Sequence, residues 1–247
     1  NFPLMIGAWK IGPALATGNS VVVKPPEIAS LSLLRLAQLA SEAGLPDGVF
    51  NVVTGRGSTA GEALGLHMDV DAIAFTGSGV VGRRLLEYAG RSNLKRVYLE
   101  LGGKSPNIVF ADVPDIKNAA KVSANGIFRN SGQVCVAGSR LLVQSSVYDR
   151  FLDELMTVTA RLKIGDPLDL GSDIGAVSSA TQLQKNLDFV ARSEQEGGHL
   201  LCGGDRLHAE TGGYYMAPAV FADVAPEMTL AREEVFGPVL AVMRFET

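Results

Sequence analysis

Apolar residues in the first hundred positions follow two alternating periods. Short runs rich in Val, Ile and Phe, which are typical of buried strands, alternate with longer segments whose apolar residues recur every three or four positions. The chain also opens directly into an apolar helical pattern after Asn1-Phe2-Pro3-Leu4. Strands are expected at 20–25, 49–53, 71–75 and 95–101, and helices at 28–43, 58–66 and 80–90. Strand, helix and strand at this interval predict βαβ units and a parallel sheet.

The pair Gly102-Gly103 interrupts this rhythm, and a second stretch of strands and helices follows it. Strands are expected at 106–110 and 141–144, near 199–202 and 217–221, and in the strand-like run at the end of the chain. Helices are expected at about 114–129, 146–162 and 178–193. We therefore predict an α/β fold with a domain boundary near residue 102.

Composition narrows the classes of function. A net charge of −4 gives no attraction to nucleic acid or to an anionic membrane, and no apolar run reaches the roughly 20 residues that a membrane helix needs. We expect no partner of either kind. Two cysteines do not make a disulfide framework, so a reducing compartment such as the cytoplasm is expected. Three histidines without metal-ligand spacing predict no metal site.

Two motifs lie where predicted parallel strands end, which is where ligands bind such sheets. In FTGSGVVG (75–82) a strand leads through glycines into a helix, whose first N–H groups favour phosphate. A tight turn without a ligand explains the same pattern. In VVVKPPE (21–27) the strand is followed by Lys24 and Glu27, and an acid there can accept hydrogen bonds from ribose hydroxyls. Taken alone, they are more simply the charges of a solvated loop.

Three further motifs hold candidate reactive groups. Cys135 lies in NSGQVCVAG (130–138), where glycines permit free N–H groups that suit an oxyanion hole, although a lone cysteine is more simply buried and inert. Glu100, in an apolar strand beside paired glycines, is expected to be partly desolvated, as suits a general base, unless it is a strand-edge residue in solvent. EEVFGPV (233–239) places two acids before an aromatic turn, which also fits a capped helix end. Cys202 has no motif around it and is expected to be structural.

Together and in this order, six motifs resemble those of the aldehyde dehydrogenase superfamily along the whole chain. They are NFPL (1–4), KPPE (24–27), FTGS (75–78), LELGGKSPN (99–107), GQVC (132–135) and EEVFGPV (233–239). Members of that family are about twice this length, so the resemblance implies a central fragment. It implies part of a Rossmann-like, NAD-binding parallel-sheet domain at 1–102 and part of an α/β catalytic domain at 103–247, both incomplete in this chain.

The resemblance implies oxidation of an aldehyde to a carboxylic acid with NAD. Cys135 resembles the nucleophile, whose thiolate gives a thiohemiacetal and, after hydride transfer, a thioester. The side-chain amide of Asn1 and the backbone N–H of Cys135 are expected to hold the oxyanion. Glu100 resembles the general base that activates water. Lys10 matches a lysine proposed as a proton relay in some members.

The resemblance also assigns residues to the cofactor. Lys24 and Glu27 resemble contacts to the adenosine ribose, and Ser78, with Gly77 giving backbone room beside it, resembles the contact to the diphosphate. Because Glu27 would face the 2′-phosphate of NADP with like charge, NAD is expected to be preferred and NADP to be used less well.

A second group of cofactor residues lies later in the chain. Glu234 resembles the ligand of the nicotinamide ribose, and Phe236 is expected to pack beside that ring. Gln182 and Lys185 fall where some members also touch the ribose, on a loose local match.

The expected partner is a small-molecule aldehyde, and the full-length protein is expected to be a homodimer or homotetramer. The stretches SNLKRVYLELGGKSPNIVFAD and IFRNSGQVCVAGSRLL resemble bacterial dehydrogenases of ω-amino aldehydes, so a small aliphatic or ω-amino aldehyde is expected. Two other classes are considered. A cofactor-independent cysteine hydrolase or acyltransferase would use Cys135 and Glu100 but leaves KPPE and FTGS unexplained. A non-catalytic nucleotide-binding protein would have no need of Cys135, Glu100 and Asn1.

Overall fold

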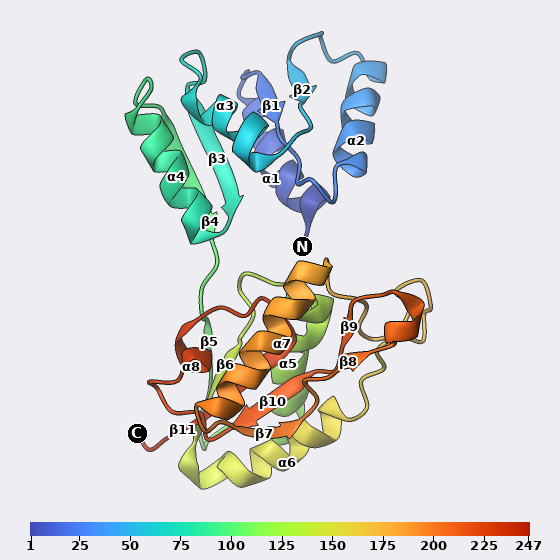
Figure 1. The fold of residues 1–247 in the computed structure, drawn as a ribbon, viewed down its shortest axis with the longest axis vertical. Coiled ribbons are helices and arrows are strands. Elements are labelled where there is room, and N and C mark those ends of the chain that lie inside the picture. The colour runs from blue at the N-terminus through green and yellow to red at the C-terminus, as the bar shows by residue number, and fades with distance from the viewer. The chain divides into compact units, whose positions relative to one another are not determined.

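The computed structural model describes all residues, 1–247, and divides into two compact units (Figure 1). One unit is Phe2–Leu101, and the other is Gly102–Thr247 together with Asn1. The division falls at the glycine pair where the rhythm of the sequence changes. Both units combine helices with parallel strands, which confirms the α/β class.

The unit Phe2–Leu101 contains two separate pairs of parallel strands. β1 (Val21–Val23) pairs with β2 (Phe50–Val52), and β3 (Ala72–Gly77) pairs with β4 (Arg96–Leu101). No strand of the unit bridges the two pairs, so the continuous parallel sheet expected from the sequence is present as two pieces. The helical segments are α1 (Pro3–Ala16), α2 (Leu31–Glu42), the π-helical turn η1 (Gly57–Gly61), α3 (Glu62–Leu66) and α4 (Gly79–Gly90).

The apolar core of this unit is small. Ile11, Leu33 and Leu85 are its large buried aliphatic side chains, whereas Ile28 and Leu31 at the start of α2 are more than two-thirds exposed, at 72% and 79%. Parallel sheets in proteins are usually covered on both faces. In this unit part of the surface of the strands is exposed, and Glu100 lies on such a strand.

The unit that begins at Gly102 is organised around one five-stranded sheet, in the order β5-β6-β11-β10-β7. Four strands run parallel, and only β7, at an edge, is antiparallel to its neighbour. The last strand of the chain, β11, therefore lies in the middle of the sheet. The bounds are β5 (Pro106–Val109), β6 (Arg140–Gln144), β7 (His199–Cys202), β10 (Ala219–Ala222) and β11 (Val239–Phe245).

Helices cover both faces of this sheet, as is usual for parallel strands (Figure 1). One face packs against α5 (Ile116–Phe128) and α6 (Tyr148–Thr159), and the other packs against α7 (Ala180–Gln195) and α8 (Thr229–Arg232). Successive strand residues alternate between the two cores. Val220, Leu240 and Val242 belong to the first core, and Phe221, Val239 and Met243 belong to the second.

The predicted helices and long strands are present, with ends shifted by a few residues. The sequence analysis missed a small antiparallel hairpin of β8 (Arg206–Leu207) and β9 (Tyr215–Met216), because two-residue strands show no period. It also missed the one-turn helix α8. Short 3-10 turns complete the unit: η2 (Arg129–Gly132), η3 (Ser145–Val147) and η4 (Ala209–Thr211).

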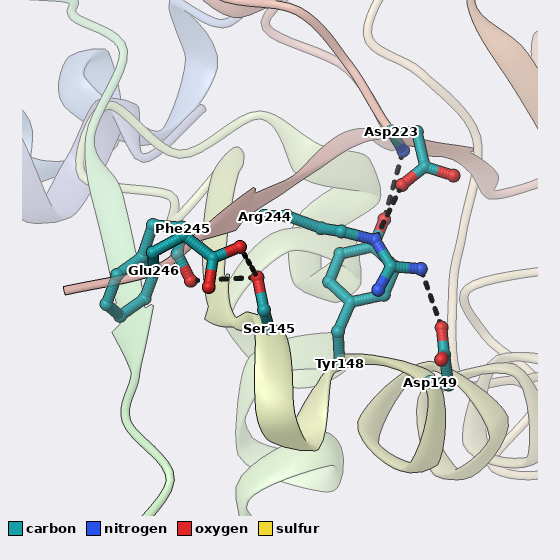
Figure 2. A network of polar contacts seen from close by, with 7 residues as sticks. All are labelled: Ser145, Tyr148, Asp149, Asp223, Arg244, Phe245 and Glu246. Carbon is teal, nitrogen blue, oxygen red and sulfur yellow. Dashed lines mark hydrogen bonds and ion pairs between the residues drawn. The ribbon is translucent and has the colours of Figure 1, made fainter.

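A polar cluster joins the end of β11 to α6 and to the turn after β10 (Figure 2). The guanidinium of Arg244 stacks on the Tyr148 ring at 3.7 Å and bonds to Asp149 at 2.6 Å and to Asp223 at 3.0 Å. The N–H of Asp223, a residue with φ 49°, donates to the Tyr148 hydroxyl. Burial raises the pKa of Tyr148, so this hydroxyl stays protonated. The cluster is structural and lies at the carboxyl-terminal end of β11.

None of the helices combines the length and the apolar composition needed to cross a membrane. No group of three or more His, Cys, Asp or Glu side chains is arranged to hold a metal ion.

Candidate active site

The turn before Cys135 is built from three consecutive residues with left-handed backbone. Asn130, Ser131 and Gly132 have φ values of 52°, 55° and 70°. A non-glycine residue in this conformation costs roughly 1–2 kcal/mol, so such a turn persists only where other contacts hold it. Within the turn, Gln133 N–H donates to Asn130 O at 3.0 Å and Asn130 Nδ2 donates to Gln133 O at 3.1 Å.

Two buried side chains attach this turn to the segment before α7. Ser131 Oγ donates to the carbonyl of Gly175 at 2.8 Å. Gln133 Nε2 donates to Ser178 Oγ at 2.8 Å, and Gln133 Oε1 accepts from Ser178 N–H at 2.9 Å. Ser131 and Gln133 are only 3% and 5% exposed. Cys135, two residues further on, is half-buried.

Cys135 has a free backbone donor and a neighbour at the start of the chain. Its N–H donates to no acceptor in the protein. Asn1 belongs to the same compact unit. Burial lowers the pKa of the Asn1 α-amino group, and the charge of the Cys135 thiolate raises that pKa by a smaller amount, so the two residues lie within electrostatic reach. The two residues assigned to the oxyanion thus lie near each other, while the role of the Asn1 amide and the Cys135 N–H stays a prediction.

Glu234 lies against the glycine pair. A Cβ at Gly102 would overlap the Glu234 carboxylate, and Gly103 N–H donates to that carboxylate. Burial raises the pKa of Glu234, and the Gly103 bond and the ammonium groups of Lys185 and Lys104 oppose that rise. The absence of a side chain at Gly102 is therefore what lets the carboxylate lie there.

Helix α7 supports the carbonyls of the same loop. Gln182 Nε2 donates to Val235 O at 2.9 Å and to Phe236 O at 3.1 Å. Lys185 Nζ donates to Glu234 O at 3.3 Å. These bonds hold a loop in which Phe236 itself has a left-handed backbone, with φ 59°.

The Cys135 loop and the Glu234 loop touch each other through their backbones. A Cβ at Gly132 would overlap the carbonyl group of Gly237, so only glycine fits there. The two loops lead into the parallel strands β6 and β11, and Lys104 leads into β5. The candidate site of this unit therefore lies at the amino-terminal edge of its parallel strands, not at the carboxyl-terminal edge typical of doubly wound sheets.

Two cations at this edge are buried without a hydrogen bond at the buried nitrogen. They are Lys104, at Nζ, and Arg140, at Nε. Burial, reinforced by repulsion from Arg140, lowers the pKa of Lys104 from 10.5 to about 8, and the Glu234 carboxylate opposes this change. The amino-terminal edge of the parallel strands therefore holds two positive charges, on Lys104 and Arg140, that are poorly solvated.

Cys202 has quite different surroundings. Its sulfur lies 4.0 Å from Met156 Sδ and 3.8 Å from the carbonyl oxygen of Pro218, packed against the apolar core beside α6. Burial raises the pKa of this thiol. A buried thiol with a raised pKa is a poor nucleophile, which agrees with the expected structural role.

In the unit Phe2–Leu101 one threonine, Thr76, is linked to both Lys10 and Glu100. Lys10 Nζ donates to Thr76 Oγ1 at 2.7 Å, and Thr76 lies opposite Glu100 in the β3–β4 ladder. The expectation that Glu100 is partly desolvated is wrong for this structure, because its side chain is exposed. It lies on an open face of β4, which pairs only with β3.

The predicted adenosine residues follow the strand ends as expected. The carboxylate of Glu27 accepts from Gly57 N–H at 2.9 Å. The stem of Lys24 passes close to Gly61, where a Cβ would stand 3.7 Å from Lys24 Cδ. Both charged residues thus lie beside the helical turn η1, an arrangement that the sequence patterns did not predict.

Ser78 and Gly77 form the entry to α4. Ser78 is the N-cap residue, and its Oγ accepts from Val81 N–H at 3.4 Å. The other N–H groups of the first turn have no partner within the helix and suit an anion. A Cβ at Gly77 would overlap the ring of Phe75, so a larger residue here would require that ring to move.

Several supporting residues were not assigned by sequence reasoning. Gln133 and Lys104 lie inside the motifs GQVC and LGGKSPN, but a motif does not show which member supports its neighbours. Gln182 and Lys185 were noted only as loose matches to ribose contacts, whereas in the structure they bind loop carbonyls. The one available signal was that a polar residue, Gln133 or Lys104, lies close to each candidate in the sequence. Their partners, such as Ser178, lie far along the chain.

Comparison with known proteins shows the family of the chain. The model of the aldehyde dehydrogenase family matches residues 1–247. The chain is 52% identical over 245 residues to the NADP/NAD-dependent aldehyde dehydrogenase PuuC of Escherichia coli, covering 99% of this chain and 49% of that protein. It is 48% identical over 246 residues to an aldehyde dehydrogenase of Agaricus bisporus, covering 100% of this chain and 49% of that protein.

Solved structures show the same relationship. An indole-3-acetaldehyde dehydrogenase in complex with NAD⁺ matches with a TM-score of 0.98 and 52% identity, over 100% of this chain and 50% of that one. A gamma-glutamyl-gamma-aminobutyraldehyde dehydrogenase from Burkholderia cenocepacia matches with a TM-score of 0.97 and 52% identity, over 100% and 49%. The chain belongs to the aldehyde dehydrogenase family. It spans about half the length of the relatives it matches.

Proposed function

We propose that the protein containing this chain oxidises an aldehyde to a carboxylic acid with NAD, through a thiohemiacetal and a thioester on Cys135. The observation that supports this most is the turn that presents Cys135. It combines a half-buried thiol, a free backbone N–H and Asn1 as a neighbour. Membership of the aldehyde dehydrogenase family supports the same reaction.

The residues of each unit fit their assigned parts of NAD. Ser78 and Gly77 lie at a helix start whose free N–H groups suit a diphosphate. Glu27 and Lys24 lie together after β1, as expected for contacts to ribose hydroxyls. Glu234, held by Gly103 N–H, offers carboxylate oxygens to the second ribose. The assignment of these residues, and of Phe236 to the nicotinamide side, is part of the proposal.

The first step is carried out by the Cys135 loop. The thiolate adds to the aldehyde carbon, a C–S bond forms, and the carbonyl π electrons move to oxygen. The Cys135 N–H and the side-chain amide of Asn1 stabilise that oxyanion. NAD, when bound, accepts the hydride that leaves the same carbon as the carbonyl re-forms. What is left on Cys135 is a thioester.

The second step is hydrolysis. Glu100 takes a proton from water, the water oxygen attacks the thioester carbon, and the C–S bond breaks to return the Cys135 thiolate. Lys10, bonded to Thr76 opposite Glu100 in the ladder, is the proposed proton relay.

We further propose NAD as the preferred cofactor, with NADP used less well, and an aliphatic or ω-amino aldehyde as substrate. The substrate proposal is supported by the local resemblance of 92–112 and 127–142 to bacterial ω-amino-aldehyde dehydrogenases. A cytoplasmic location is proposed from the two free cysteines. A homodimer or homotetramer is proposed from the family resemblance.

One assay tests the proposal. The protein at its full natural length is mixed with NAD and a panel that includes γ-glutamyl-aminobutyraldehyde, aminobutyraldehyde, propanal and indole-3-acetaldehyde, and NADH is followed by absorbance. Aldehyde-dependent NADH formation is expected, fastest with an ω-amino or aliphatic substrate. Hydrolysis of thioesters or esters without any NADH from any aldehyde would instead favour a cofactor-independent cysteine hydrolase. Preference for indole-3-acetaldehyde would overturn only the substrate proposal.

A further inference from the structure

Gln133 makes a reciprocal pair with a residue 45 positions away. Its amide donates to Ser178 Oγ at 2.8 Å and accepts from Ser178 N–H at 2.9 Å. Both polar ends of the side chain are therefore satisfied inside the protein, and the residue is only 5% exposed. Loss of either bond would leave a buried polar atom without a partner.

The pair lies at the point where the strained turn ends and the Cys135 segment begins. The left-handed residues end at Gly132, Gln133 follows, and Cys135 is two residues later. The next backbone bond, from Ala137 N–H to Val134 O at 3.0 Å, closes the other side of the thiol. Between these two fixed points the Cys135 N–H donates to nothing in the protein.

We infer that Gln133 is a positioning residue, which fixes the direction of the Cys135 thiol and N–H by tying the turn to Ser178. This rests on the proposed function, since it supposes that Cys135 is the nucleophile. The physical basis is that an attacking atom and an oxyanion donor must be held within a few tenths of an ångström to be effective. A turn with left-handed Asn130 and Ser131 does not hold that geometry by local preference.

The test is Gln133→Leu in the full-length enzyme, with Gln184→Leu as matched control. Leucine is similar in size but removes both bonds, whereas Gln184 is an exposed residue of α7 that bonds only to Asp188. We expect kcat to fall by at least tenfold in Gln133→Leu while KM for NAD changes by less than threefold. Gln184→Leu should keep kcat within twofold of wild type.

A second readout separates positioning from general loss of structure. With the turn released, Cys135 should react several-fold faster with a bulky disulfide reagent, while labelling of Cys202 stays unchanged. Greater exposure together with slower turnover is the signature of a misdirected nucleophile. If both cysteines become reactive and the melting temperature collapses, or if kcat and the labelling of Cys135 both stay as in wild type, the inference is wrong.

Ser178 offers a test without any substitution in the Cys135 loop itself. Ser178→Ala removes the hydroxyl but keeps the backbone bond, and Ser178→Thr keeps both on an exposed residue. We expect Ser178→Ala to lower kcat about three- to tenfold and Ser178→Thr to restore it. Equal activity in all three proteins would overturn the inference. Labelling of Cys135 needs no turnover, so it tests the positioning even if the proposed oxidation fails.

Discussion

The two cysteines lie in the same compact unit but in opposite kinds of surroundings. Cys135 follows a strained turn held by buried polar side chains, and its backbone N–H is free. Cys202 ends strand β7 and packs between a thioether and the core, where burial raises its pKa. Cys135 therefore follows a loop that polar contacts hold, whereas Cys202 is enclosed by apolar packing.

The difference shows that what surrounds a cysteine is more informative than the cysteine itself. Each cysteine lies close to a glycine with left-handed backbone, Gly132 before Cys135 and Gly203 directly after Cys202. Only the Cys135 turn is anchored by buried Ser131 and Gln133 and touches a loop with a half-buried acid. The left-handed turn before Cys135 is thus fixed by polar anchors, as is typical of functional sites, whereas Gly203 closes the end of a strand.

Replacing each thiol tests the contrast most strongly. In the full-length enzyme, Cys135→Ala should lower kcat more than a thousandfold, on the order of 4 kcal/mol in the barrier, while NAD still binds. Cys202→Ala should keep kcat within about twofold, because that sulfur packs against Met156, the Pro218 carbonyl and the apolar core. Turnover by Cys135→Ala at the wild-type rate would show that Cys135 is not the nucleophile.

The matched glycines test whether both turns are strained but only one is functional. In Gly132→Ala the new Cβ would overlap Gly237 O, and in Gly203→Ala it would overlap Pro218 O, with φ +70° and +67°. Each should lose about 2–4 kcal/mol in the free energy of unfolding by urea, from φ strain and overlap together. Gly212→Ala, at φ +75° but in open space, should lose only about 1 kcal/mol.

Activity then separates the two turns. At a temperature where all variants are folded, only Gly132→Ala should change kcat and the labelling rate of Cys135. An equal drop in kcat for Gly203→Ala would mean that the two turns are not functionally different.

Lys104 gives the Cys135 region a pH dependence of its own. Its folded pKa of about 8 lies below its usual value of 10.5, so the stability it contributes is present above pH 10.5 and is lost as pH falls through 8. Lys104→Met should therefore be more stable than wild type at pH 7, by up to about 3 kcal/mol, and the gain should vanish toward pH 10. Thermal unfolding from pH 6.5 to 10 measures this, and exposed Lys121→Met should show no such trend.

Cys202 should act in the opposite direction over the same range. Its folded pKa is raised by burial, so its neutral thiol contributes stability that is complete below the unfolded pKa and is lost as pH rises through the folded one. Cys202→Ala should flatten that alkaline loss. A loss of the same slope in the variant would show that the thiol is not effectively buried.

Glu27 lies outside both cysteine regions and should affect cofactor choice alone. Glu27→Gln keeps an acceptor for Gly57 N–H but removes the charge that would repel a 2′-phosphate. The ratio of kcat/KM for NADP to that for NAD should rise about tenfold, or about 1.4 kcal/mol, with Glu42→Gln on α2 as control. An unchanged ratio would make the assignment of Glu27 wrong.

The secondary structure was predictable where periodicity is long. Helices such as α5 and α7 and strands such as β4 and β11 appear close to their expected positions, because each buries a stripe or a face. The central place of β11 in its sheet was not predictable, because strand order depends on pairing between segments about a hundred residues apart. The split of the first sheet into two pairs was missed because periodicity identifies strands but does not show which strands pair.

The site was predictable at the level of motifs and not at the level of support. Cys135, Asn1 and Glu234 belong to one compact unit, whereas the domain bounds expected from the sequence placed Asn1 in the first domain; the roles of the three residues stay predictions. The bond between Gln133 and Ser178 and the unpaired ammonium of Lys104 are tertiary features that leave no local pattern. The exposure of Glu100 was missed because an apolar strand does not show which of its faces is covered.

The central claim is that the thiol of Cys135, and not that of Cys202, forms the covalent intermediate. Full-length enzyme is mixed with NAD and a substrate aldehyde, quenched in acid within the first turnover, and digested for peptide mass spectrometry. The account predicts an added acyl group on the peptide that contains Cys135, with none on the Cys202 peptide and none when NAD is left out. NADH formation accompanied by an acyl group on any other residue, or by no acyl group at all, would contradict it.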